Sequence, residues 1–206
     1  MTAVDAGMTR TFALSFDYRC PWARIVHEHV MEGLRAGAEW DVTFIPFSLA
    51  QVHVEEGQTP VWARPDEDSG LLALQASLAV RDTQPTKFLA VHHGLFEHRH
   101  GRAGELRDRD ELSAVLADAG ADVENVWAEV ESGRPLATAE KEHTSYVESH
   151  NMWGVPTFIV GDRAVFVRLM SLPDGDGELA ISTVNRILDQ IDWPMVNEFK
   201  HTSIPR

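Results

Sequence analysis

The chain is nearly devoid of cysteine: Cys20 is the only one among its 206 residues. A single cysteine excludes an intramolecular disulfide, so the chain is not one of the small secreted domains that depend on such cross-links. A chain of this length buries a sizeable core without them. The expected compartment is the cytoplasm, where a thiol stays reduced unless its own chemistry oxidises it.

Positive charge and long apolar runs are also scarce. The chain has 18 Lys and Arg against 32 Asp and Glu, for a formal net charge of −14. This acidic balance disfavours nucleic acid and anionic membrane as general partners. No apolar run approaches the roughly 20 residues that span a bilayer, and the N-terminal stretch lacks the pattern of a signal peptide. We therefore expect a soluble globular protein whose partners are neither nucleic acid nor membrane.

Strand patterns lie at the two ends of the chain. Residues 11–16 alternate apolar side chains and predict a strand, the apolar spacing from Trp22 to Leu34 predicts a helix, and 41–47 predict a second strand. Strand, helix and strand in succession form a βαβ unit with parallel strands. Two β-branched runs around Gly161-Asp162 predict a hairpin, and an amphipathic helix closes the pattern at 178–191.

The middle of the chain is helical throughout, with almost no strand signal from about residue 59 to 150. The two ends together predict an α/β protein, a thioredoxin fold with a mixed sheet, interrupted by a large helical insertion. We expect residues 1–58 and 151–206 to form a discontinuous thioredoxin-like domain, and residues 59–150 to form the insertion.

Cys20 lies where the first strand gives way to the first helix. Unpaired N–H groups and the helix dipole at a helix N-terminus favour a thiolate, which predicts a thiol pKa below the usual value of about 8.5. Pro21 is compatible with the first turn, where its missing N–H has no helical partner. Arg19 and Arg24 flank the thiol, and either stabilise a thiolate, hold an anionic ligand or lie in solvent. The alternative for Cys20 is a small buried apolar side chain.

Pro156 marks a second corner, directly before the predicted strand of residues 157–160. A proline there starts a strand or lies at an edge, because it has no N–H for the ladder. In a thioredoxin fold this proline is cis and lies beside the thiol. We therefore expect a cis bond between Val155 and Pro156, with the backbone of Val155 facing Cys20. Trp22 and Trp153 flank the two corners and are expected to line a ligand groove.

Four histidines are crowded between residues 92 and 100. A metal site is disfavoured, because His92 and His93 do not share a helix face and no cysteine completes a zinc set. We expect all four at the surface or the end of a helix. His27 and His29 lie too far along their helix from the thiol to act as its base. Asp17 is predicted to be either a buried carboxylate or a turn residue.

The segments "FDYRCPW" near residue 20 and "GVPTFIV" near 156, with the helical insertion, resemble the DsbA-like thioredoxin superfamily. The chain is most similar to an actinobacterial branch of mycothiol-dependent reductases, which includes nitroreductases. A CPWC corner, an FSLAQ-like segment (47–51 here), a GTPT-like turn and an FELKRT-like tail (197–202 here) recur there in this order. The resemblance implies a nucleophilic thiol at Cys20, a cis Pro156 and a groove between core and insertion. The binding residues expected around it are Arg19, Pro21, Trp22, Ala23, Trp153, Val155 and Pro156.

The chain departs from this pattern at Ala23, where the family has its second, resolving cysteine. Disulfide exchange passes through a mixed disulfide, which a monothiol enzyme cannot resolve by itself. We therefore expect a low-molecular-weight thiol, of mycothiol or glutathione type, as co-substrate, with no tightly bound cofactor and no metal. A cycle through sulfenic acid that small thiols reduce is a further possibility.

Two other classes of function remain open. Transferases and isomerases related to the kappa-class glutathione transferases use the same corner to bind a thiol, which then acts on a small electrophile. A thioredoxin-fold binding module that has lost its catalysis is the third alternative. The sequence leaves the oligomeric state open, and a homodimer is compatible with it.

Overall fold

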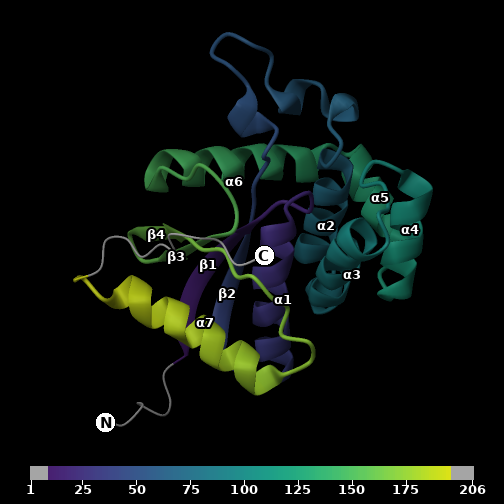
Figure 1. Ribbon diagram of the computed structural model, residues 1–206. Helices are drawn as coiled ribbons and strands as arrows, with labels where there is room; N and C mark the ends of the chain where they lie inside the picture. Colours follow the sequence, from purple (N-terminus) through teal and green to yellow (C-terminus); the bar gives the residue numbers. More distant parts are fainter. Residues whose placement is uncertain (1–8, 196–206) are drawn as a thin grey trace.

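One mixed four-stranded sheet forms the centre of the molecule in the computed structural model, which describes residues 9–195 (Figure 1). Its strands are ordered β2-β1-β3-β4. β1 pairs in parallel with β2, while the β1–β3 and β3–β4 pairs are antiparallel. The βαβ unit and the hairpin predicted from sequence are thus confirmed. The strands are β1 (Arg10–Phe16), β2 (Trp40–Pro46), β3 (Thr157–Val160) and β4 (Arg163–Phe166).

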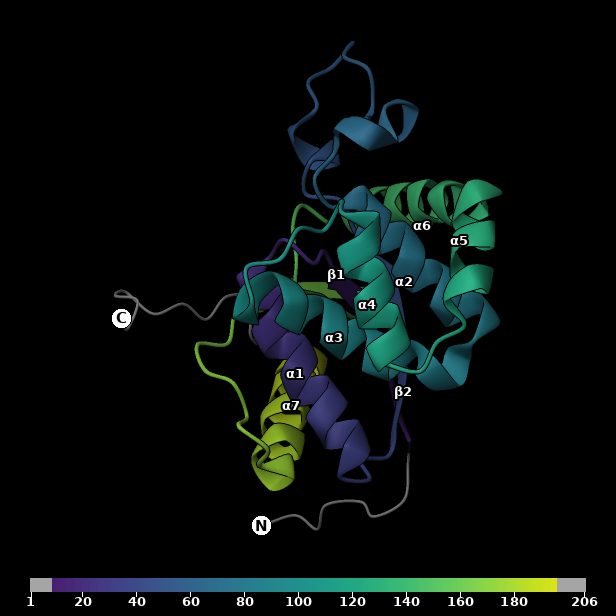
Figure 2. The same ribbon diagram turned by 90° about the vertical axis from the view of Figure 1, so that its right-hand side faces the viewer.

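Within residues 9–195, two α-helices belong to the sheet-forming ends of the chain and five lie between β2 and β3. α1 (Pro21–Arg35) follows β1, and α7 (Gly177–Asp192) follows β4; the two pack against each other. The insertion helices α2 to α5 gather on one side of the sheet, and α6 extends back along it (Figures 1 and 2). They are α2 (Leu71–Thr83), α3 (Phe88–Gly101), α4 (Arg109–Asp118), α5 (Val123–Glu131) and α6 (Arg134–His150).

The fold is therefore α/β, a thioredoxin fold with a helical insertion, as expected. The boundaries at residues 58 and 151 remain a prediction.

The start and end of α1 follow from its sequence. Cys20 is the N-cap, its sulfur accepts the Ala23 N–H, and Pro21 occupies the first helical position. Val26 and Val30 lie one turn apart on the buried face. The helix ends at Arg35, and Gly37 then adopts a φ of 89°, a left-handed conformation that suits glycine.

The insertion is joined to the sheet by both apolar and polar contacts. The rings of Phe44 on β2 and Phe88 at the start of α3 lie 5.2 Å apart, within one buried apolar cluster that contains residues of sheet and insertion. Arg81 on α2 donates to the Phe44 carbonyl at 3.0 Å. It also forms a two-pronged ion pair with Glu142 on α6, at 2.7 and 2.8 Å. These contacts fix the insertion against the edge strand.

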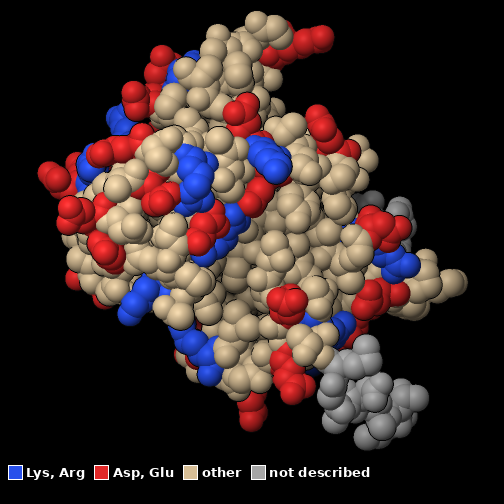
Figure 3. All heavy atoms as spheres, turned by 180° about the vertical axis from the view of Figure 1, so that it is seen from behind, with Lys and Arg blue, Asp and Glu red and all other residues tan. Residues whose placement is uncertain are grey.

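The surface carries interspersed charges. Figure 3 shows acidic side chains spread over one face, with lysines and arginines between them. Among residues 9–195, no helix combines the length and the apolar character needed to cross a bilayer.

Candidate thiol site

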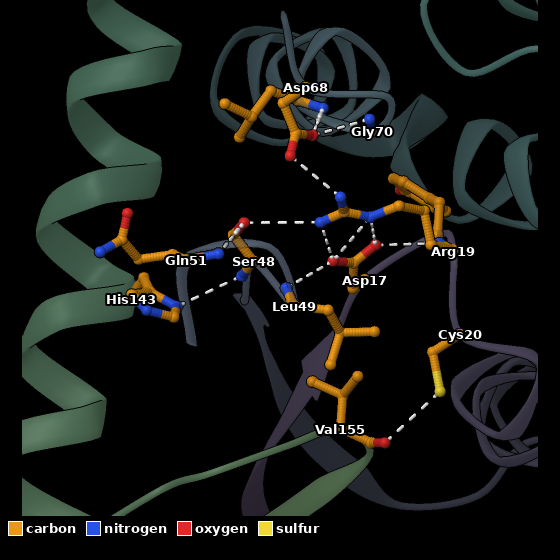
Figure 4. A network of polar contacts seen from close by, with 12 residues as sticks. Asp17, Arg19, Cys20, Ser48, Leu49, Gln51, Asp68, Gly70, His143 and Val155 are labelled. Carbon is orange, nitrogen blue, oxygen red and sulfur yellow. Dashed lines mark hydrogen bonds and ion pairs between the residues drawn. The ribbon is translucent and has the colours of Figure 1, made fainter. Parts of the chain in front are cut away.

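The Cys20 sulfur lies between the first turn of α1 and the loop before β3 (Figure 4). It accepts the Ala23 N–H at 3.4 Å, and its S–H donates to the Val155 carbonyl at 3.5 Å. The Cys20 side chain is almost covered, with 7% of the residue exposed. The structure thus brings together two corners that are 135 residues apart in sequence.

The loop that faces the thiol is held on both sides. The Val155–Pro156 bond is cis, the form that the resemblance implied. The Thr157 N–H donates to the Ser15 hydroxyl at 2.9 Å, which attaches the loop to β1. The Val167 N–H donates to the Pro156 carbonyl at 3.1 Å, so the chain just after β4 lies beside the same loop.

Burial raises the pKa of the Cys20 thiol. The N–H groups of Ala23 and Trp22 lower this pKa, as does the positive charge of Arg168, while the negative charge of Asp17 raises it. Loss of solvation outweighs the helix N-terminus, so the lowered pKa expected from sequence is wrong for this structure. The resting sulfur is a neutral thiol that donates to a carbonyl.

Asp17 is a buried carboxylate, which decides between the two predicted alternatives. It accepts hydrogen bonds from Arg19 at 2.6 Å (Nη2) and 3.0 Å (Nε), and from the Leu49 N–H at 2.8 Å (Figure 4). The Asp17 carbonyl also accepts the Cys20 N–H at 3.0 Å. This residue therefore connects the turn of residues 17–20, here called the thiol turn, to the segment after β2.

Asp68 extends the same network into the insertion. Its Oδ2 accepts from Arg19 Nη1 at 3.0 Å, and its Oδ1 accepts the N–H groups of Gly70 and Leu71, where α2 begins. Ser48 lies in the same network, with its N–H bound to His143 Nδ1 on α6 at 3.2 Å. The thiol turn is therefore connected through hydrogen bonds to α2 and α6.

The two arginines that flank the thiol in sequence form ion pairs with carboxylates and do not contact the sulfur. Arg19 is paired with Asp17 and Asp68, and Arg24 is paired with Glu97 at 2.6 Å. Both side chains are largely covered, so the exposed alternative is also wrong. Sequence spacing does not reveal these partners, because Asp68 and Glu97 come from the insertion.

A cation that the sequence patterns do not single out, Arg168, lies on Trp22. The guanidinium carbon of Arg168 is 4.8 Å from the centre of the Trp22 ring, a cation–π contact. Trp153 is 66% exposed, and its ring lies 4.6 Å from that of Phe166. Each of the two tryptophans expected to line the groove thus contacts a residue at the end of β4 or just after it. In the sequence, only one feature points to Arg168: it follows the predicted hairpin, whose first strand begins directly after Pro156.

A buried chain of hydrogen bonds runs from β1 through α1 to α3. His27 Nε2 meets the Ser15 carbonyl at 3.1 Å, His92 Nε2 meets His27 Nδ1 at 2.8 Å, and Tyr18 Oη meets His92 Nδ1 at 2.7 Å. The Ser15 carbonyl only accepts, so His27 donates to it, His92 donates to His27, and Tyr18 donates to His92. Each ring nitrogen is thereby satisfied with both imidazoles neutral.

Burial explains why both rings stay neutral. It lowers the pKa of His27 to about 3 and that of His92 well below its usual value. The surface position predicted for His92 is therefore wrong, because this residue packs into the core and has polar partners there. His98 is also buried, whereas His93 and His100 are partly exposed. Within residues 9–195, no cluster of three or more histidine, cysteine or acidic side chains is arranged to hold a metal ion.

A cavity of about 650 Å³ lies away from the thiol, at the edge of β2. Its walls include Trp40 and Phe44 of β2, Phe88 of α3 and Tyr146 of α6, and no residue of the thiol corner. It is therefore not the groove that the resemblance placed beside Cys20.

Comparison with known proteins identifies the fold. Residues 11–172 match the family model of the DSBA-like thioredoxin domain. A search of the curated proteins finds no match. The tail "NEFKHT", 197–202, on which part of the finer resemblance rests, lies outside the described residues.

Solved structures agree with this family match. A thioredoxin-like oxidoreductase from Silicibacter pomeroyi has a TM-score of 0.55 at 22% identity, over 87% of this chain and 86% of the other. The thiol-disulfide exchange protein alpha-DsbA2 from Wolbachia pipientis has a TM-score of 0.60 at 16% identity, over 91% and 84%. A 2-hydroxychromene-2-carboxylate isomerase has a TM-score of 0.62 at 13% identity, over 87% and 96%. At these identities the likeness concerns the fold. With a family match that covers most of its length, the chain belongs to the DsbA-like thioredoxin domain family.

Proposed function

We propose that the protein is a monothiol thiol–disulfide oxidoreductase in which Cys20 is the nucleophile. The observation that carries this proposal is the position of the Cys20 sulfur, at the N-terminus of α1 and 3.5 Å from the Val155 carbonyl. Ala23 occupies the place of a resolving cysteine and is fully buried. The co-substrate is a low-molecular-weight thiol, of mycothiol type as in the actinobacterial branch or of glutathione type.

The proposed cycle has two exchange steps. Cys20 loses its proton to solvent, and the thiolate attacks a mixed disulfide between a small thiol and a substrate thiol, at the sulfur of the small thiol. A mixed disulfide of the small thiol forms on Cys20, and the substrate leaves as a reduced thiolate. A second small thiolate then attacks the mixed disulfide at the sulfur of the bound small thiol, which releases the Cys20 thiolate and a new small disulfide. The Ala23 N–H, 3.4 Å from the Cys20 sulfur, stabilises the negative charge in both steps.

The proposed cofactor requirement, compartment and co-substrate follow from the monothiol mechanism. The protein holds no tightly bound cofactor, works in the cytoplasm, and meets its thiol as a diffusing co-substrate. One cysteine and a net charge of −14 support a cytoplasmic partner that is neither nucleic acid nor membrane.

Intact-mass measurement tests the proposal. The reduced protein is incubated separately with glutathione disulfide and mycothiol disulfide over a range of alkaline pH. We expect one small-thiol adduct on Cys20, lost when the free thiol is added, and none on Cys20→Ser. Absence of any adduct at a pH where iodoacetamide alkylates Cys20 would contradict the mechanism.

A second candidate is a thiol-dependent isomerase, which two observations favour. Burial raises the pKa of Cys20, and a carboxylate isomerase shares the fold. In that case Cys20 positions a bound small thiol that attacks an electrophile. Cys20→Ser then retains thiol binding and turnover, whereas complete loss of both exchange and turnover supports the oxidoreductase.

A further inference from the structure

Arg168 differs from most arginines of the protein in its partners. Within residues 9–195, no carboxylate forms an ion pair with it, and its side chain is exposed beside the thiol corner. In a chain of net charge −14, most arginines of the described part are ion-paired. The paired ones are Arg10, Arg19, Arg24, Arg35, Arg64, Arg81, Arg99, Arg109 and Arg134.

The backbone holds Arg168 in place. The hydrogen bond from the Val167 N–H to the Pro156 carbonyl, at 3.1 Å, fixes the residue just before it against the loop that faces the sulfur. The guanidinium then lies over the ring of Trp22, 4.8 Å from its centre. Trp22 is two residues beyond Cys20, in the first turn of α1. Arg168 is thus linked to both sides of the thiol corner, to the loop through the backbone of Val167 and to α1 through its own side chain.

We propose that Arg168, supported by the indole of Trp22, binds a carboxylate on the small disulfide that Cys20 attacks. This inference rests on the proposed function and specifies its substrate as an anionic disulfide. A guanidinium stacked on an aromatic ring keeps its N–H groups free at the edge, and a carboxylate accepts two of them. The overall negative charge repels anions, so a local unpaired cation is required to attract one.

Exchange with three related disulfides tests the inference. The probes are the disulfides of mercaptopropionate, mercaptoethanol and cysteamine, which are anionic, neutral and cationic. The second-order rate constant for adduct formation on Cys20 is followed by intact mass, in the natural protein, in Arg168→Gln and in Arg186→Gln. Arg186 is an exposed arginine on α7, so its variant is a matched control for net charge.

The anionic-to-neutral rate ratio is the decisive quantity, because a change in thiolate fraction cancels in it. We expect this ratio to fall about fivefold in Arg168→Gln and to stay unchanged in Arg186→Gln. High salt lowers the ratio of the natural protein toward that of Arg168→Gln, because salt screens exposed charges. An equal ratio in the natural protein and Arg168→Gln overturns the inference while exchange itself persists. If none of the three disulfides reacts, the proposed function fails as well.

Discussion

Two opposing influences act on Cys20. The N–H groups of the first turn of α1 favour the thiolate, and burial of the sulfur disfavours it. The pKa is raised, so burial dominates in the resting protein. The residue has the geometry of a nucleophile and the protonation state of a thiol at rest.

The pH profile of alkylation measures this balance. Because the pKa of Cys20 is raised in the folded protein, its thiolate forms at higher pH than in the unfolded chain. We expect the iodoacetamide rate of the native protein to reach half its maximum at a higher pH than the rate measured in concentrated urea. A native midpoint at or below the unfolded one would contradict the dominance of burial.

Restoring the missing thiol tests the role of Ala23. The Ala23 N–H lies 3.4 Å from the Cys20 sulfur, so the side chains of positions 20 and 23 face the same turn. In Ala23→Cys we expect the small-thiol adduct to be displaced without added thiol, with an internal disulfide as product. Thiol release after adduct formation, monitored by mass, gives the result. Ala50→Cys, a partly exposed position outside this turn, is the control and retains its adduct.

The elements α1 and α3 are joined by a fully satisfied polar chain. Tyr18, His92 and His27 are completely or almost completely buried, and each hydrogen bond in their chain has one defined donor. Such a chain specifies how the insertion meets the core, because loss of one partner leaves a buried polar group unpaired.

The two tyrosines of the protein provide a matched test of this chain. Tyr18→Phe leaves His92 Nδ1 buried without its donor, which costs about 1–3 kcal/mol in the free energy of unfolding. Tyr146→Phe removes a partly exposed hydroxyl and is expected to change this free energy by less than about 0.5 kcal/mol. Urea unfolding of the two variants gives both values. Equal losses of unfolding free energy in the two variants would contradict a stabilising role of the Tyr18–His92 hydrogen bond.

The buried histidines also make the fold sensitive to acid. Burial lowers the pKa of His27 from 6.5 to about 3, so the unfolded chain binds a proton more readily than the folded one. Their contribution to stability is therefore complete above pH 6.5 and is lost as the pH falls below it. Between pH 7 and 5 we expect His27 alone to account for a loss of about 2 kcal/mol.

Urea unfolding of the natural protein and of His27→Gln, each at pH 7 and pH 5, measures how much of the loss of stability comes from His27. Glutamine keeps a donor and an acceptor but does not titrate, so the variant loses less stability on acidification. His143→Gln is a second variant, because burial lowers the pKa of His143 to about 4. If both variants lose as much stability as the natural protein, the linkage is refuted.

Strands, helices and turns were predictable where the local pattern of apolar and turn residues determines them. The alternation in residues 11–16, the helical spacing after Trp22 and the Gly161-Asp162 turn each specify a strand, a helix or a hairpin within a short window. The bonds of Asp17 to Leu49, of Arg19 to Asp68 and of His92 to His27 were not predictable in this way. Each of them joins segments that are far apart in sequence, and the local spacing of a side chain does not indicate which distant segment will pack against it.

At the scale of the whole molecule, the sheet and the insertion share one core. Phe44 and Phe88 belong to the same buried apolar cluster, and Arg81 connects α2 to both β2 and α6. The thiol turn is itself bound to the insertion through Arg19 and Asp68. A boundary that is sharp in sequence is thus crossed by apolar packing, ion pairs and hydrogen bonds in the fold.

This continuity predicts a single unfolding transition. Trp62 and Trp127 are buried within the insertion segment and Trp40 is buried on β2, so tryptophan emission reports on the packing of both parts, while far-ultraviolet circular dichroism reports on the whole backbone. We expect the two signals to change together along a urea titration. Separate midpoints would contradict a single transition.

The hydrogen bond from Cys20 to the Val155 carbonyl has a consequence once a disulfide forms. A disulfide sulfur has no proton, so the carbonyl lacks this donor for as long as the small thiol stays attached to Cys20. Val155 is buried, and a buried acceptor without a donor is unfavourable. In the proposed cycle, an adduct that offers an N–H at that point restores the hydrogen bond, and is therefore favoured over an adduct that leaves the Val155 carbonyl without a donor.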